Sequence, residues 1–302
     1  MSALDLAPLL APIDGEHRAG RWLRYDTVYA DIRRMREADD PDLPQGVWKR
    51  ELKRADWNGV AARAADALAS QSKDMLLAAW LTEAWVYLDG VAGLAAGLRL
   101  MAALARGFWS DLYPPLDGES AAARLQPVAW AADKLLFPLK SIRITAAGDE
   151  KPLTWADYER ALYYENLEKS HPESAHAAYA NGAIAHERFT AAALLTPMSF
   201  YKRLTDDLGD ARAAVDELEA TLDELAGAEE TPSFAELREL LDAVSAFAEK
   251  RGISAAPDDD ADLAPLREAA EALLRTHSRD ELLKALLAVP GMQRDEEEEP
   301  MR

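Results

Sequence analysis

The apolar residues of this chain recur at helical spacing from residue 57 to residue 108, and no other feature constrains the fold as strongly. Three stripes of apolar side chains repeat every three or four positions, and only a few residues separate one stripe from the next. Asp56 and Asp74 stand where N-caps of the first two helices belong, and Gly90 follows the second stripe. Short connections make consecutive helices antiparallel neighbours, so we predict a helical bundle.

Helical patterns continue after a break at residues 140–151, where Ile142 and Ile144 alternate with polar residues as in a linker or a small β-like excursion. Thr154–Asp157 and Ser233–Glu236 resemble capping boxes, and residues 208–225 form a long amphipathic stripe between them. The fold class is therefore predicted to be all-α, with a helical hairpin in the second part. The predicted regions are an N-terminal domain (1–145), a hairpin region (152–252), short helices (263–289) and an acidic tail (290–302).

Charge and tryptophan are distributed unevenly along the 302 residues. Residues 201–302 hold 27 acidic and 12 basic side chains, whereas all eight tryptophans lie at or before Trp155. The pI near 4.7 argues against nucleic-acid partners, which require clustered Lys and Arg. The absence of cysteine excludes disulfide scaffolds, iron–sulfur centres and cysteine nucleophiles.

No residue pattern satisfies the geometry of a metal or catalytic site. Asp258, Asp260 and Asp262 match the start of a calcium loop, but Leu263 and Ala269 replace its glycine and its bidentate glutamate. A pair of general acids requires two carboxylates at a defined distance. The sequence does not define the distance between any two of Glu83, Asp89 and Asp111. The five histidines form no HExxH motif; they are His17, His171, His176, His186 and His277. We predict no catalytic, cofactor-binding or metal-binding residues and no enzymatic activity.

The sequence also favours a cytoplasmic protein that is not inserted in a membrane. Residues 1–10 lack a basic region of the kind that begins a signal peptide. The apolar stretch from Met75 to Phe108 is interrupted by charges, so it contains no uninterrupted span of about 20 apolar residues.

Several short blocks, taken in order, resemble one known family. They are Leu9-Leu-Ala-Pro-Ile-Asp-Gly15, Leu23-Arg-Tyr-Asp26, Gln45-Gly-Val-Trp48, Lys53-Arg-Ala-Asp-Trp57, Ser72-Lys-Asp74, Gly90-Val-Ala-Gly-Leu-Ala-Ala-Gly-Leu98 and Phe108-Trp-Ser-Asp-Leu-Tyr-Pro114. Over roughly residues 8 to 137 the series resembles the ImpA N-terminal domain, which marks the TssA family of bacterial type VI secretion systems. The resemblance implies an ImpA-type helical domain, and most of its blocks meet structural requirements such as caps and turns.

Two departures from the family pattern affect what the resemblance implies. Family members usually have Asn-Pro-x-Gly-Glu-Asp before Leu-Arg-Tyr-Asp, whereas this chain has His17-Arg-Ala-Gly-Arg-Trp22. His277–Leu282 resembles the entry to a ring-forming domain of longer members, but the chain continues only through Val289–Met292 to an acidic run. We therefore expect a monomer or a small homo-oligomer.

The resemblance implies a non-enzymatic secretion component that helps to assemble the baseplate and the contractile sheath, with baseplate, sheath or tube proteins as partners. Two alternatives stay open: a helical adaptor or immunity-like module outside the machine, and an enzyme that uses carboxylates in a helical cleft. The partner-binding candidates lie in one N-terminal segment; they are Asp14, His17, Arg18, Arg21, Trp22, Arg24 and Tyr25.

Overall fold

The computed structural model describes residues 5–39, 52–118, 120–147, 151–253 and 270–271, which are helical with no strand longer than an isolated bridge. The predicted all-α class is confirmed. The chain forms two compact units, one of residues 1–139 and 206–243 and the other of residues 140–205 and 244–302. The block at Gln45–Trp48, the acidic tail and all but residues 270–271 of the predicted short helices lie outside the described residues.

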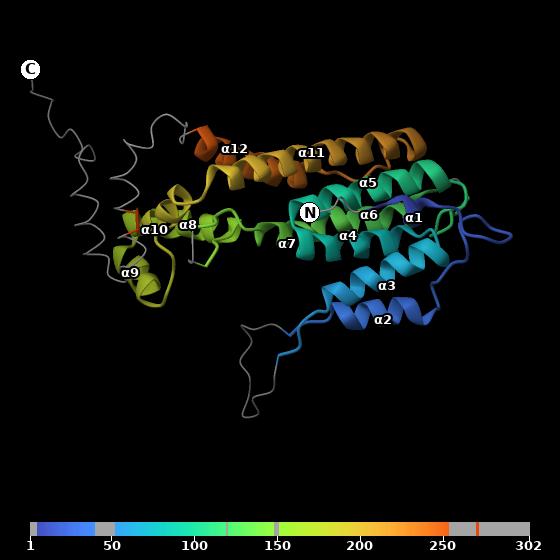
Figure 1. Ribbon diagram of the computed structural model, residues 1–302, viewed down its shortest axis with the longest axis horizontal. Coiled ribbons are helices and arrows are strands. Elements are labelled where there is room, and N and C mark those ends of the chain that lie inside the picture. Colours follow the sequence, from blue (N-terminus) through green and yellow to red (C-terminus); the bar gives the residue numbers. More distant parts are fainter. Residues whose placement is uncertain (1–4, 40–51, 119, 148–150, 254–269, 272–302) are drawn as a thin grey trace, which may run out of the picture. The chain divides into compact units, whose positions relative to one another are not determined.

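The helices begin and end as follows (Figure 1). The first unit holds α1 (Ala7–Leu10), α2 (Thr27–Arg36), α3 (Trp57–Ser70), α4 (Met75–Asp89), α5 (Val91–Phe108), α6 (Ala122–Lys134) and nearly all of α7 (Leu136–Lys140). The second holds α8 (Trp155–Ser170), α9 (Pro172–Ala180) and α10 (His186–Leu194). The long helices α11 (Met198–Ala226) and α12 (Ala235–Ile253) each contribute residues to both units.

The core of the first unit is built on α3, α4 and α5, which contact one another in chain order (Figure 1). The side chain of Asp56 accepts a hydrogen bond from the Gly59 N–H at the start of α3, and that of Asp74 accepts from Leu76 and Leu77 at the start of α4. Gly90 ends α4 with φ of 63°, a conformation that favours glycine. The predicted caps and boundaries of these helices are confirmed.

Two glycines of α5 allow its close approach to α4. A Cβ atom at Gly93 would lie 2.1 Å from the backbone oxygen of Trp85, and one at Gly97 would lie 2.3 Å from the side chain of Thr82. Within the described residues α5 is the one helix long and apolar enough to cross a membrane, but 67% of it is buried inside the protein. It therefore packs as a core helix.

The first unit also includes most of the helical hairpin, which the sequence boundaries assigned to residues 152–252. Residues 206–243 belong to this unit, in which the apolar side chains of α11 are buried and two of its acidic side chains pair with arginines of α5. Arg99 pairs with Asp210 at 3.2 Å and Arg106 pairs with Glu217 at 2.6 Å. The apolar periodicity identifies the hairpin, but it does not specify which helices the hairpin packs against.

The second unit has an aromatic core around Phe247, whose ring centroid lies 5.0 Å from that of Tyr158 and 5.9 Å from that of Phe189. Thr154 and Asp157 form the predicted capping box at the start of α8. Just before it, the Ile144 N–H donates to the Leu153 carbonyl at 2.9 Å, so the break at residues 140–151 makes a β-like contact with the residues that follow it. Within α8 only Trp155 and Ala161 are buried, which leaves most of this helix at the surface.

Candidate partner-binding surface

Three backbone segments of the first unit meet beside the N-terminal candidate residues. They are residues 19–21, residues 71–75 and Tyr113, and each lies within or next to a block of the family resemblance. The Arg21 N–H donates to the Gln71 carbonyl at 3.0 Å, and the Lys73 N–H donates to the Ala19 carbonyl at 2.8 Å. The Tyr113 N–H donates to the Lys73 carbonyl at 3.0 Å, and the Met75 N–H donates to the Tyr113 carbonyl at 2.8 Å. Blocks that are far apart in the sequence therefore support one local structure.

Asp74 is a buried carboxylate at this junction. Besides capping α4, it accepts a hydrogen bond from the Tyr29 hydroxyl, which ties α2 to α4. Burial raises the pKa of Asp74 to about 6, although the hydrogen bonds from Tyr29 and from two backbone N–H groups act in the opposite direction.

The neighbouring Lys73 is also fully buried, and its ammonium group is satisfied by backbone carbonyls. Its Nζ donates to the carbonyl of Leu9 at 2.8 Å and to that of Leu68 at 2.6 Å. Burial lowers the pKa of Lys73 to about 8. This side chain fastens α1 to the end of α3.

Arg124 supports the same region from α6, and the sequence patterns gave no indication of this role. Its guanidinium donates to the carbonyls of Trp109, Leu112 and Pro114, with the last distance at 2.9 Å. Burial lowers the pKa of Arg124 to about 10. Because all three acceptors belong to the loop after α5, Arg124 fixes the position of Tyr113 within that loop.

Aromatic and cationic side chains are stacked at the surface above this support. The rings of Trp22 and Tyr113 are parallel within 4°, with centroids 6.4 Å apart. The Arg24 guanidinium lies 5.2 Å from the Trp22 ring and 5.5 Å from the Tyr25 ring. Tyr25 is 91% exposed, whereas Leu23, two residues earlier, is completely buried and anchors the segment.

The other predicted residues differ in the contacts that they make within the chain. Arg18 donates to the Gly107 carbonyl at 2.7 Å and lies 4.7 Å from the centre of the Phe108 ring. Arg21 pairs with Asp26 at 2.8 Å, and this bond lowers the pKa of Asp26. Asp14 and His17 are exposed, and His17 borders a cavity of about 300 Å³ beside Arg18 and Ser110. The structure thus brings Trp22, Arg24 and Tyr25 together, while Arg18 and Arg21 make contacts within the chain.

Among the described residues, the side chains considered for chemistry form no metal-binding group; Asp258, Asp260, Asp262 and His277 lie outside those residues. Glu83 is paired with Arg36 at 2.5 Å on the side of the bundle formed by α2 and α4. Across the part of the chain that the structure describes, no three His, Asp or Glu side chains are placed to hold a metal ion.

Comparison with known proteins points to one family. The family model described as the N-terminal ImpA region of type VI secretion systems matches residues 10–133. The chain is 33% identical over 116 residues to the type VI secretion system component TssA1 of Pseudomonas aeruginosa, which covers 38% of this chain and 33% of that protein. The chain thus matches about one third of the length of this curated relative.

A solved structure matches more of the chain. It is the N-terminal domain, including the conserved ImpA_N region, of the TssA component of the type VI secretion system from Burkholderia cenocepacia. The TM-score is 0.74 at 29% identity, and the match covers 83% of this chain and 94% of that one. The similarity in structure therefore extends well beyond residues 10–133.

Proposed function

Because this chain carries an ImpA N-terminal domain of the TssA family over residues 10–133, we propose that it is a non-enzymatic component of a bacterial type VI secretion system. In this role it assists assembly of the baseplate and of the contractile sheath by binding their proteins in the cytoplasm. It acts as a monomer or a small homo-oligomer.

One observation supports binding as the mode of action: the blocks shared with the family hold a stacked, exposed surface in place. Three buried side chains form their hydrogen bonds with the protein's own backbone or with a neighbouring hydroxyl, namely Lys73, Asp74 and Arg124. Above this support Arg24 and Tyr25 are exposed and Trp22 is half-buried, and we call these three residues the stacked surface. Trp, Tyr and Arg are the residue types enriched at the energetic centres of protein interfaces.

The Trp22 side of the stacked surface is supported by the protein's own structure, and such support favours binding. Trp22 rests on Tyr113, which is itself bonded to the backbone of Lys73 and Met75. A side chain that is already ordered loses little conformational freedom when a partner covers it. Partners with an apolar pocket next to an acidic group complement the Tyr25 ring and the Arg24 guanidinium.

The proposal is tested by affinity purification of the tagged full chain from cells with an intact secretion system, followed by mass spectrometry. Sheath or baseplate proteins are expected to co-purify. Tyr25→Ala and Arg24→Ala should each weaken their recovery about tenfold, as expected for interface centres. The matched control is Tyr163→Ala on α8, a tyrosine that is 61% exposed and lies in the other unit.

A deletion strain tests the role in secretion itself. Secretion of the tube protein should fall sharply without this chain and return with the wild-type copy. Normal secretion in the deletion strain would contradict the proposal. If instead the co-purified proteins belong to no secretion component, the adaptor outside the machine becomes the better account.

A further inference from the structure

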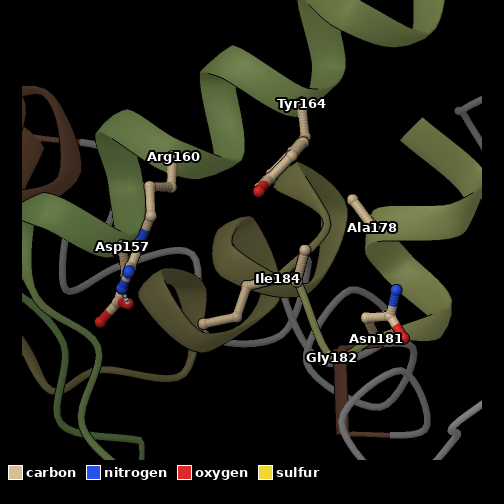
Figure 2. A pocket seen from close by; sticks show the side chains of 8 residues that line it. Asp157, Arg160, Tyr164, Ala178, Asn181, Gly182 and Ile184 are labelled. Carbon is tan, nitrogen blue, oxygen red and sulfur yellow. Dashed lines mark hydrogen bonds and ion pairs between the residues drawn. The ribbon is translucent and has the colours of Figure 1, made fainter. Parts of the chain in front are cut away.

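The second unit contains a pocket that the proposed function does not use. Its volume is about 420 Å³, and it lies between α8 and the segment that joins α9 to α10 (Figure 2). Asp157, Arg160 and Tyr164 contribute from successive turns of one face of α8. The opposite side is formed by the end of α9 and by Gly182, Ala183 and Ile184.

The polar atoms of Asp157 are already occupied. One carboxylate oxygen accepts from Arg160 at 2.6 Å, and the other accepts from the backbone N–H and the hydroxyl of Thr154, both at 2.8 Å. Burial acts to raise the pKa of Asp157, but these hydrogen bonds outweigh it and the pKa is lowered. Asp157 therefore stays ionised at neutral pH and keeps the Arg160 guanidinium at the mouth of the pocket.

The remaining hydrogen-bonding capacity of the pocket consists mainly of donors. Arg160 has five N–H groups, one of which is directed at Asp157, and its side chain is 67% exposed. Tyr164 adds a hydroxyl that points into the space between α8 and Ile184, and Asn181 adds an amide at the rim (Figure 2). A ligand that accepts several hydrogen bonds and carries negative charge complements this set.

We propose that this pocket binds a Glu or Asp side chain presented by an extended segment of a partner protein. The carboxylate accepts from Arg160 and Tyr164, and the neighbouring residues of the segment pack on Ile184 and Ala178. The apolar wall favours a peptide over a free small anion, because a free anion would gain only the polar contacts, of which the exposed Arg160 contact is screened by water, and would leave Ile184 and Ala178 uncovered. This binding site is separate from the stacked surface of the first unit.

The experiment is an NMR titration of the isotope-labelled full chain with three probes at millimolar concentration. The probes are the blocked tripeptide acetyl-Leu-Glu-Leu-amide, its Gln counterpart and free glutarate. The Glu peptide is expected to shift the backbone amide of Gly182 and the side-chain amide of Asn181 saturably, and to bind at least about tenfold more tightly than the Gln peptide.

Two variants locate the binding. Arg160→Gln should weaken the Glu peptide about tenfold, and Tyr164→Phe, which removes only the hydroxyl, should weaken it several-fold. Arg203→Gln, at an exposed arginine of the same unit outside the pocket, should leave binding unchanged. Equal binding of the Glu and Gln peptides, or full binding by Arg160→Gln, would overturn the proposal. Tighter binding of glutarate than of the Glu peptide would also overturn it, because the site would then prefer a free anion.

Discussion

Around Lys73 and Asp74 the first unit buries two charged side chains, whereas in the second unit Arg160 stands largely exposed at the mouth of a pocket. The buried pair is bonded mainly to backbone groups and fixes the path of the chain. The exposed arginine has donors left for another molecule. The family model matches residues 10–133, all within the first unit. The sequence blocks shared with the family therefore consist largely of residues that stabilise the first unit from inside. The residues that bind other molecules, in either unit, must be sought among the exposed side chains.

The largest expected effect comes from removing Arg124, which like Lys73 is a buried cation of the first unit. Arg124→Ala leaves the carbonyls of Trp109, Leu112 and Pro114 without their donor and opens a cavity. We expect the free energy of unfolding to fall by about 3–5 kcal/mol. Urea denaturation followed by tryptophan fluorescence measures this. Arg160→Ala in the second unit should lower the free energy of unfolding by no more than about 0.5 kcal/mol. A similar decrease for both variants would contradict the difference between the buried arginine of the first unit and the exposed arginine of the second.

Asp74 should give the first unit a pH dependence of its own. Its pKa of about 6 lies above the value near 3.9 of an unfolded chain, so the folded state binds more protons between these values. Stability from this group is therefore present below about pH 4 and is lost as the pH rises through about 6, by about 2–3 kcal/mol. Urea denaturation of the wild type and of Asp74→Asn from pH 4 to 7 measures the contribution of Asp74, as the difference between the two pH profiles of the free energy of unfolding. Identical pH profiles would show that Asp74 titrates normally.

A pair of glycines in α5 tests the packing of the core. Gly97→Ala places a methyl group against Thr82 and should destabilise the protein by about 1–3 kcal/mol. Gly107→Ala in the same helix meets no atom within 4 Å and should stabilise it by about 0.5–1 kcal/mol. Thermal unfolding distinguishes the two by opposite shifts in Tm. A gain in stability for Gly97→Ala would mean that α4 and α5 are further apart than described.

A smaller effect than those of Arg124→Ala and Asp74→Asn is expected in the second unit, at the capping box of α8. Thr154→Ala removes the hydroxyl that bonds the Asp157 N–H, and it should cost about 1 kcal/mol. Hydrogen exchange should rise in the first turn of α8 and stay unchanged in α3 and α4. Faster exchange throughout the first unit would show that the two units do not open independently.

The sequence predicted the features that depend on neighbouring residues. Asp56, Asp74 and Thr154 were recognised as caps because an N-cap and the N–H groups it satisfies lie within three residues of each other. The helices α3 to α5 followed from periodicity alone. Trp80 and Trp85 of α4 are buried, whereas Trp57 at the start of α3 is only half-buried and its ring centroid lies 4.0 Å from that of Tyr87.

Features that depend on distant residues could not be predicted in the same way. The three carbonyls that Arg124 binds are 10 to 15 residues away, and nothing in their side chains indicates that they are acceptors. Similarly, residues 206–243 join the first unit through contacts such as Arg106–Glu217, which are 111 residues apart. The pocket beside Arg160 needs a turn of the chain at Gly182 with φ of 92°, which the sequence pattern did not locate.

The contact between Lys73 and Leu9 has a consequence for the order of folding. It closes a loop of 64 residues, whereas the bond from Lys73 to Leu68 spans only five. Closing the longer loop costs more chain entropy, so we expect α3 and α4 to pack before the four-residue α1 docks on the Lys73 side chain. We therefore expect the N-terminal helix to attach after α3 and α4 have packed and to detach before they separate.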